Sequence, residues 1–238
     1  SGGFSKNANV GFGYGDLDKD GFNIFGMLDT QSQRAITGTQ RNYNKRYPGG
    51  ISPTTSPANY YQDDQTGNPT APSCAAGTFL VPSGDGTSCN MSTSNFVDYV
   101  PKSKRTTGLL KGVLKLNANH EISLEYLNSE SKVYSAIAPV PYGGLRQNRT
   151  RLDGSPNPFY PGNGNFTPNI PLDANYIDPN FMPAGVKPGF VNVKWRDLPN
   201  GSRADENINK QQRLVAGLNG NLAGWDYNAA LTFNENKV

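Results

Sequence analysis

Hydrophobic and polar residues alternate along three separate stretches of the chain. In the middle stretch, Leu110, Leu114 and Leu116 alternate with Lys111 and Lys115. A period of two places successive side chains on opposite faces of a strand, so this pattern predicts β-strands. Each stretch reads as two strands joined by a tight turn. We therefore expect an all-β, antiparallel protein with about six strands of roughly ten residues. These strands form three hairpins, at about residues 5–33, 105–133 and 208–238.

The prolines support this division of the chain. All 18 prolines lie between Pro48 and Pro199, and residues 1–47, 102–138 and 200–238 contain none. Proline cannot donate a hydrogen bond to a sheet ladder, so the proline-free intervals are the expected strands. The proline-rich intervals, about 34–104 and 134–207, are expected to be two very long loops. Connections in compact domains are usually about 4–6 residues long, so these loops are exceptional.

The first hairpin contains a stretch with two interpretations, "YGDLDKDGFNIF". Asp16, Asp18, Asp20 and Gly21 stand in the order of a calcium-binding loop. The twelfth position of such a loop needs a bidentate carboxylate, and Met27 stands there. Alternating residues precede and follow the aspartates, which favours a hairpin turn. Calcium binding is the minor alternative.

The second hairpin predicts a particular register. If "NAN" at 117–119 is the turn, Lys115 faces Glu121 and Lys111 faces Glu125. Opposite charges directly across a strand pair stabilise it by a few tenths of a kcal/mol. Both pairs are expected on the face opposite to Leu114.

Composition excludes several function classes. Hydrophobic residues make up 35% of the chain and charged residues 17%, and the net charge of +3 is spread without a basic block. We therefore expect no nucleic-acid partner. There is no run of 18 apolar residues that would form a transmembrane helix. His120 is the only histidine, and no nucleophile motif accompanies it. The chain is interpreted as non-enzymatic, without a cofactor or a bound metal.

Two cysteines, Cys74 and Cys89, lie in the first proline-rich interval. With no second cysteine pair and no nearby histidine, a zinc site is not expected. A disulfide between them would fit an oxidising compartment, and two unpaired thiols are the alternative.

Short turns at one end of the strands and very long loops at the other are typical of outer-membrane β-barrels. A soluble β-sheet protein with long surface loops, such as a carbohydrate-binding or adhesin-like domain, is the alternative. The stretches "GYGDLDKDGFNIFGMLDTQSQ" and "QQRLVAGLNGNLAGWDYNAALTFNENKV" resemble barrel segments of TonB-dependent outer-membrane receptors of Gram-negative bacteria. The nearest group is the Oar-like or carbohydrate-associated receptors.

The resemblance implies a 22-strand barrel filled by an N-terminal plug, which imports a scarce ligand with energy passed through the TonB complex. This chain shows no plug, so we expect a partial barrel in the bacterial outer membrane. Its edge strands, near Val10 and Leu231, would pair with polypeptide outside these residues, because membrane-spanning sheets must close. One row of side chains is expected to face lipid: Leu110, Leu114, Leu116, Ile122, Leu124, Tyr227, Leu231 and Phe233.

Any ligand is expected to be captured by the two loops. An oligosaccharide would need aromatic platforms with polar residues at their edges, and an iron siderophore is the rival ligand. The candidate residues, which could instead pack the loops on themselves, are Tyr60, Tyr61, Tyr142, Tyr160, Tyr176, Trp195 and Arg196.

Overall fold

The computed structural model describes residues 3–42, 50–83, 86–178 and 184–238. The chain divides into two compact units, each built from separate segments. The first, here called the sheet unit, comprises Ser1–Gln40, Asp98–Ala136 and Ala204–Val238. The second, the loop unit, comprises Arg41–Val97 and Ile137–Arg203.

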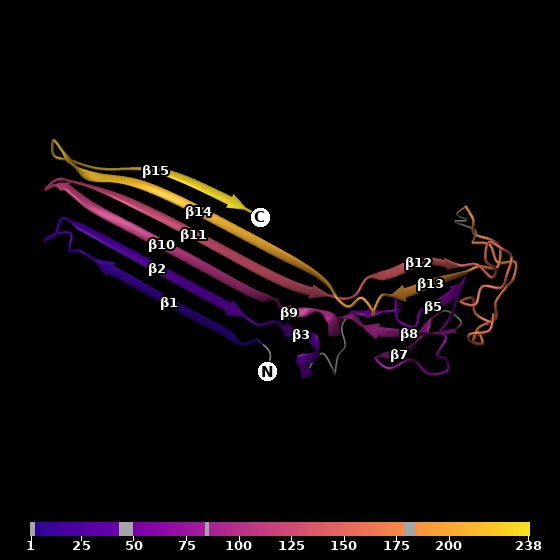
Figure 1. The fold of residues 1–238 in the computed structure, drawn as a ribbon. Helices are drawn as coiled ribbons and strands as arrows, with labels where there is room; N and C mark the ends of the chain where they lie inside the picture. Colours follow the sequence, from indigo (N-terminus) through magenta and orange to yellow (C-terminus); the bar gives the residue numbers. More distant parts are fainter. Residues whose placement is uncertain (1–2, 43–49, 84–85, 179–183) are drawn as a thin grey trace. The chain divides into compact units, whose positions relative to one another are not determined.

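The sheet unit is one six-stranded sheet with the order β1-β2-β10-β11-β14-β15 (Figure 1). Its strands are β1 (Ser5–Tyr14), β2 (Phe22–Gln33), β10 (Lys102–Asn117), β11 (His120–Ile137), β14 (Arg203–Leu222) and β15 (Trp225–Lys237). The hairpins β1–β2, β10–β11 and β14–β15 are antiparallel, as is the pair β2–β10. The prediction of an all-β, antiparallel protein is confirmed. The sheet is open: within the described residues, β1 and β15 are edges and do not pair with each other. A small pair of strands, β3 (Ile36–Thr37) and β9 (Asp98–Val100), and the 3-10 helix η1 (Gly38–Gln40) complete this unit.

Most strands are longer than the ten residues predicted. β10, β11 and β14 contain 16, 18 and 20 residues. The strands were predicted too short because their length was inferred from the apolar residues alone. Beyond Leu110 and Tyr126 the alternation continues in polar residues, and Thr106 still pairs with Glu130. A polar side chain that faces solvent is compatible with an extended backbone, so the ladder continues beyond the apolar part.

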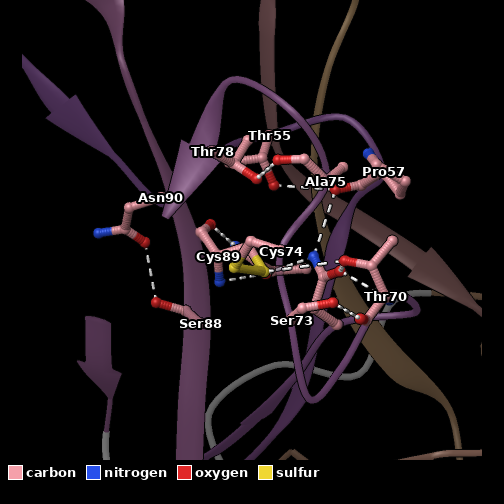
Figure 2. Close-up of a disulfide and its surroundings, with 12 residues drawn as sticks. Thr55, Pro57, Thr70, Ser73, Cys74, Ala75, Thr78, Ser88, Cys89 and Asn90 are labelled. Carbon is pink, nitrogen blue, oxygen red and sulfur yellow. Dashed lines mark hydrogen bonds between the residues drawn. A yellow bond between two sulfur atoms is a disulfide. The ribbon is translucent and has the colours of Figure 1, made fainter. Parts of the chain in front are cut away.

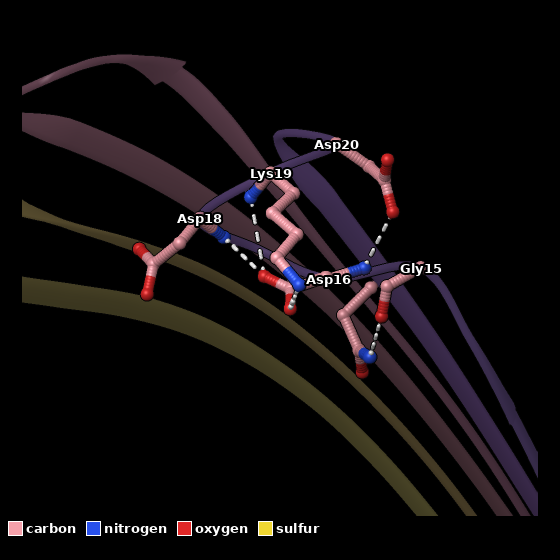
Figure 3. A network of polar contacts seen from close by, with 6 residues as sticks. Gly15, Asp16, Asp18, Lys19 and Asp20 are labelled. Atoms are coloured by element: carbon pink, nitrogen blue, oxygen red, sulfur yellow. Dashed lines mark hydrogen bonds and ion pairs between the residues drawn. The ribbon is translucent and has the colours of Figure 1, made fainter.

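The aspartate-rich stretch is a hairpin turn between β1 and β2, as predicted (Figure 3). The Asp16 carboxylate accepts hydrogen bonds from the backbone N–H of Asp18 at 2.9 Å and of Lys19 at 3.1 Å. The Asp20 carboxylate accepts the backbone N–H of Asp16 at 2.9 Å. Asp18 instead forms an ion pair with Lys115, which lowers the pKa of Asp18. The three carboxylates therefore satisfy separate partners, and this arrangement gives calcium binding no support.

The predicted register of the second hairpin is confirmed. Lys111 lies opposite Glu125 and Lys115 opposite Glu121. The turn itself is shorter than predicted, because Asn117 pairs with His120 and the register shifts between Lys115 and Asn117. The extra residue of this bulge takes up the difference between a two-residue and a three-residue turn.

The two faces of the sheet differ in polarity. Charged residues of neighbouring strands meet on one face, where the Arg213 guanidinium donates to the Glu125 carboxylate at 2.6 Å. The other face carries the row that was expected to face lipid. Tyr227 in this row is half-buried, and its hydroxyl lies 2.8 Å from His120 Nδ1. The other seven are between 38% and 80% exposed, so they form no core of their own: Leu110, Leu114, Leu116, Ile122, Leu124, Leu231 and Phe233.

The loop unit, which covers most of the two intervals expected to be very long loops, contains regular structure. It contains a four-stranded sheet, β12-β13-β5-β6, and a three-stranded sheet, β4-β8-β7. The strands are β4 (Ile51–Ser52), β5 (Asn59–Gln62), β6 (Gln65–Gly67), β7 (Thr78–Ser83), β8 (Gly86–Ser92), β12 (Pro141–Gln147) and β13 (Val191–Arg196), with a 3-10 helix η2 (Thr93–Phe96). Prolines do not prevent these strands, because Pro82 and Pro141 lie in β7 and β12, which are edge strands.

Candidate functional site

A disulfide joins Cys74 to Cys89 in the loop unit, as predicted (Figure 2). The two Cα atoms are 5.6 Å apart, within the usual range for this bond. Cys89 lies in β8 and is buried. The side chain of Asn59, in β5, bonds to both polar groups of the Cys89 backbone. It donates to the Cys89 carbonyl at 2.7 Å and accepts the Cys89 N–H at 3.1 Å. The disulfide and Asn59 thus tie the segment that follows β6 to the two sheets.

Four of the seven predicted ligand-binding residues are buried in the loop unit. The Tyr60 hydroxyl donates to Asn169 Oδ1 at 2.8 Å, and the Tyr160 hydroxyl donates to the Gly189 carbonyl at 2.7 Å. The Tyr176 ring packs against Phe190 with 5.2 Å between ring centroids. Burial raises the pKa of all three tyrosines. Their hydroxyl or ring contacts lie within the protein, so these side chains hold the unit together and are not exposed platforms.

Arg196 is the fourth buried residue, at 4% exposure. Its guanidinium donates to the carbonyls of Thr54 at 2.9 Å and Pro139 at 2.7 Å, and to the Ser52 hydroxyl at 3.0 Å. Burial, and to a smaller extent Arg203, lower its pKa. Because Ser52 and Thr54 belong to one segment of the loop unit and Pro139 to the other, Arg196 joins the two segments.

The remaining three candidates, Tyr61, Tyr142 and Trp195, lie on the four-stranded sheet. Tyr142 and Trp195 are cross-strand partners and stack with 5.5 Å between centroids and 14° between planes. Tyr61 follows Tyr60 along β5, so it lies on the opposite face from Tyr60. There the Lys194 ammonium is 4.7 Å from the centroid of its ring. The predicted residues therefore do not form one site.

A cavity of about 460 Å³ lies over one face of the same sheet. Alternation along β13 directs Val191, Val193 and Trp195 to this face. Across the strands, Val193 pairs with Leu145 on one side and Tyr60 on the other. The complete lining is Ala58, Tyr60, Pro69, Leu145, Gln147, Phe159, Pro161, Phe166, Val191, Val193 and Trp195.

The lining contains no charged residue. Its polar atoms are few. The Tyr60 hydroxyl already donates to Asn169 Oδ1, and the side-chain oxygen Oε1 of Gln147 already accepts a hydrogen bond from Asn157. Such a surface binds by excluding water from an apolar ligand face, with a small number of polar groups to fix orientation. The cavity has no group placed for acid–base or nucleophilic chemistry.

Tyr60 and Trp195 are the two lining residues that the sequence predicts as ligand-binding, and the other nine were not predicted. The alternation of Val191, Val193 and Trp195 in "VNVKWR" was the signal that could have found the sheet face. Phe159 and Phe166 come from an irregular segment, where no periodicity indicates which side chains turn inward.

Comparison with known proteins identified no relative: no family model, no curated protein and no solved structure matches this chain. Among the residues that the structure describes, no helix has the length and apolar character to span a membrane. No group of three or more histidine, cysteine, aspartate or glutamate side chains is placed to hold a metal ion in the described parts of the chain.

Proposed function

We propose that this chain is part of a TonB-dependent receptor of the bacterial outer membrane, in which the sheet unit is a section of the transmembrane barrel. The observation that carries the proposal is the exposed apolar face of the six-stranded sheet. Leu231 is 80% exposed and Phe233 is 65% exposed. Large exposed apolar patches mark contact with another protein or with a membrane. An apolar face over a whole sheet, opposite a polar face, is the pattern of a barrel wall.

The height of this apolar face agrees with a bilayer. On β15 the apolar positions run from Trp225 to Phe233, which is eight residue steps. At about 3.4 Å per residue this is about 27 Å along the strand. At the usual tilt of about 35–45°, it gives about 20 Å across the membrane, comparable with the apolar band of about 25 Å in known barrels. Trp225 at the turn end of the band would belong to the aromatic girdle.

In this proposal the loop unit faces the outside of the cell and captures a small ligand. The cavity over the four-stranded sheet, with Trp195 and Tyr60 in its lining, is the candidate capture site. An oligosaccharide could place an apolar ring face on Trp195, and a siderophore could place an aromatic ring there. Uptake would require the rest of the barrel, the plug and the TonB complex, which are the proposed partners.

The dependence of folding on detergent tests this proposal. We expect the refolded chain to show β-sheet circular dichroism in detergent micelles and to aggregate without them. A folded monomer in detergent-free buffer would contradict the receptor and favour the soluble carbohydrate-binding or adhesin-like alternative.

A matched pair of variants sharpens the test. Leu124 lies on the apolar face, and its neighbour Ser123 lies on the face with Glu125. We expect Leu124→Arg to destabilise the protein folded into lipid by about 2–4 kcal/mol, and Ser123→Arg by less than about 1 kcal/mol. Equal effects would show that the two faces have the same surroundings.

A further inference from the structure

The exposed apolar side chains on one face of the six-stranded sheet are here called the apolar band, and this face changes character toward the strand ends that lie away from the hairpin turns. On β2 and β10 the band ends at Leu28 and Gly108, which pair with each other. The next residues on the same face are Thr30 and Thr106, and then Ser32 and Lys104. Only one position on this face, occupied by Thr30 and Thr106, therefore separates the apolar band from the first lysine, Lys104.

Lysines gather along this border in two rows that cross the strands. In one row, Lys6 pairs with Ser32, Ser32 with Lys104, and Lys104 with Lys132. In the other row, nearer the band, the Glu130 carboxylate lies 3.5 Å from the Lys210 ammonium, and Lys210 pairs with Lys237. Together the rows span all six strands of the sheet.

Positive charge exceeds negative charge in these rows. Glu130 lies between Lys132 at 3.1 Å and Lys210 at 3.5 Å, and Glu235 lies 3.0 Å from Lys237. The two glutamates thus form ion pairs with three of the five lysines in these rows, which are Lys6, Lys104, Lys132, Lys210 and Lys237. Within the described part of the chain, no ion pair holds the Lys104 ammonium. Lys104 lies directly opposite Lys132, and like charges in this position destabilise a sheet.

A hollow of about 440 Å³ joins the lysines to the apolar band. Leu28 and Gly108 lie at its apolar end, and Lys104 and Lys132 at its cationic end. A Cβ placed on Gly108 would meet no atom within 4 Å, so this part of the hollow is open. Of the remaining lining residues, Thr106 and Asn128 can donate hydrogen bonds, and the Glu130 carboxylate is paired with Lys132 at 3.1 Å.

We propose that this hollow binds the phosphate of a membrane lipid, with the acyl chains lying on the apolar band. A phosphate between Lys104 and Lys132 would turn a repulsive pair into two charge-assisted contacts. The order of apolar band, hydroxyl groups and lysines along one face matches the order of acyl chain, glycerol and phosphate in the lipid. The inference rests on the proposed membrane location of the sheet unit, and it adds a preference for anionic lipid.

Co-flotation of the whole chain with lipid vesicles tests the proposal. The chain is diluted from urea onto vesicles of phosphatidylcholine alone or with phosphatidic acid, at low and high salt. We expect binding to both kinds, with tighter binding to the anionic vesicles that weakens as salt rises. A lysine near an anionic surface contributes about fivefold in affinity, equivalent to about 1 kcal/mol. The variant Lys104→Gln/Lys132→Gln should therefore lose on the order of tenfold or more on anionic vesicles only.

The control variant Lys19→Gln/Lys187→Gln removes the same charge from other places. It should bind both kinds of vesicle as the unchanged chain does. If both double variants lose affinity equally, the effect is one of net charge and the specific site is refuted. Equal binding of the unchanged chain to both kinds of vesicle also overturns the site, and leaves the membrane proposal standing. If no vesicles bind the chain, the membrane proposal fails and this inference fails with it.

Discussion

Arg196 gives the sharpest prediction about the stability of the loop unit. Its guanidinium joins the two segments of this unit through Thr54, Pro139 and Ser52. Methionine has a similar length and can fill much of the same space, but it donates no hydrogen bond. The change Arg196→Met therefore leaves the carbonyls of Thr54 and Pro139 without this donor.

The expected loss follows from these contacts. A buried acceptor that loses its partner costs about 1–3 kcal/mol, and two carbonyls are affected. Removal of the buried charge offsets part of this loss, because burial itself disfavours the guanidinium, as its lowered pKa shows. We expect the free energy of unfolding of the loop unit to fall by about 2–5 kcal/mol.

Urea unfolding followed by tryptophan fluorescence measures this effect. The variant Trp225→Phe leaves Trp195, in the loop unit, as the only tryptophan. The control is Arg151→Met, because the Arg151 side chain is exposed. The interpretation that Arg196 stabilises the contact between the two segments would be refuted in either of two cases. The free energy of unfolding would fall by less than about 1 kcal/mol in Arg196→Met, or it would fall by the same amount in Arg151→Met.

Three further predictions follow from single features. Replacing Cys74 and Cys89 by serine should cost about 3 kcal/mol in urea unfolding, because the disulfide closes a loop of about 15 residues; an unchanged midpoint would contradict this. Burial raises the pKa of tyrosines in the loop unit, so the folded state keeps protons that the unfolded state loses above about pH 10. The contribution of these tyrosines to stability should therefore be constant below that pH and be lost as pH rises further. A tyrosine titration at 295 nm that matches that of the unfolded chain would argue against it. Gly26→Ala should cost about 1–3 kcal/mol, because its Cβ would lie 2.3 Å from the Phe12 ring. Gly112→Ala on the same face meets nothing within 4 Å and should cost far less; equal losses would refute the steric reason.

The sheet unit could be predicted from the sequence because its physical signal is local. Each strand alternates, and each turn carries residues suited to it, such as Asp16 and Gly21. The turn assigned to 117–119 predicts that Lys111 lies opposite Glu125, and the structure has that register although its turn is one residue shorter. The extra strand length was missed because polar residues such as Lys104 extend the ladder without any apolar partner.

The loop unit could not be predicted in the same way, because polar residues form much of its interior. Thr55 and Asn59 are fully buried, and Asn68 is nearly so. Asn59 bonds to Asn68 at 2.9 Å and to the backbone of Cys89, so its burial is compensated by partners 9 and 30 residues away in the sequence. No periodic pattern marks such residues. For the same reason the sequence predicts the tyrosines as ligand platforms, because their hydroxyl partners, such as Asn169 for Tyr60, are not visible in it.

The most direct test of the membrane proposal compares the two faces of one strand inside a bilayer. Leu110 lies on the apolar face of β10, and the next residue, Lys111, lies on the face with Glu125. Each is replaced by tryptophan in a chain that also carries Trp195→Phe and Trp225→Phe, so that one tryptophan remains. The chains are folded into vesicles of lipids brominated on their acyl chains, and quenching of the fluorescence is measured. The proposal predicts strong quenching at position 110 and weak quenching at position 111, and equal quenching, or none at either position, would contradict it.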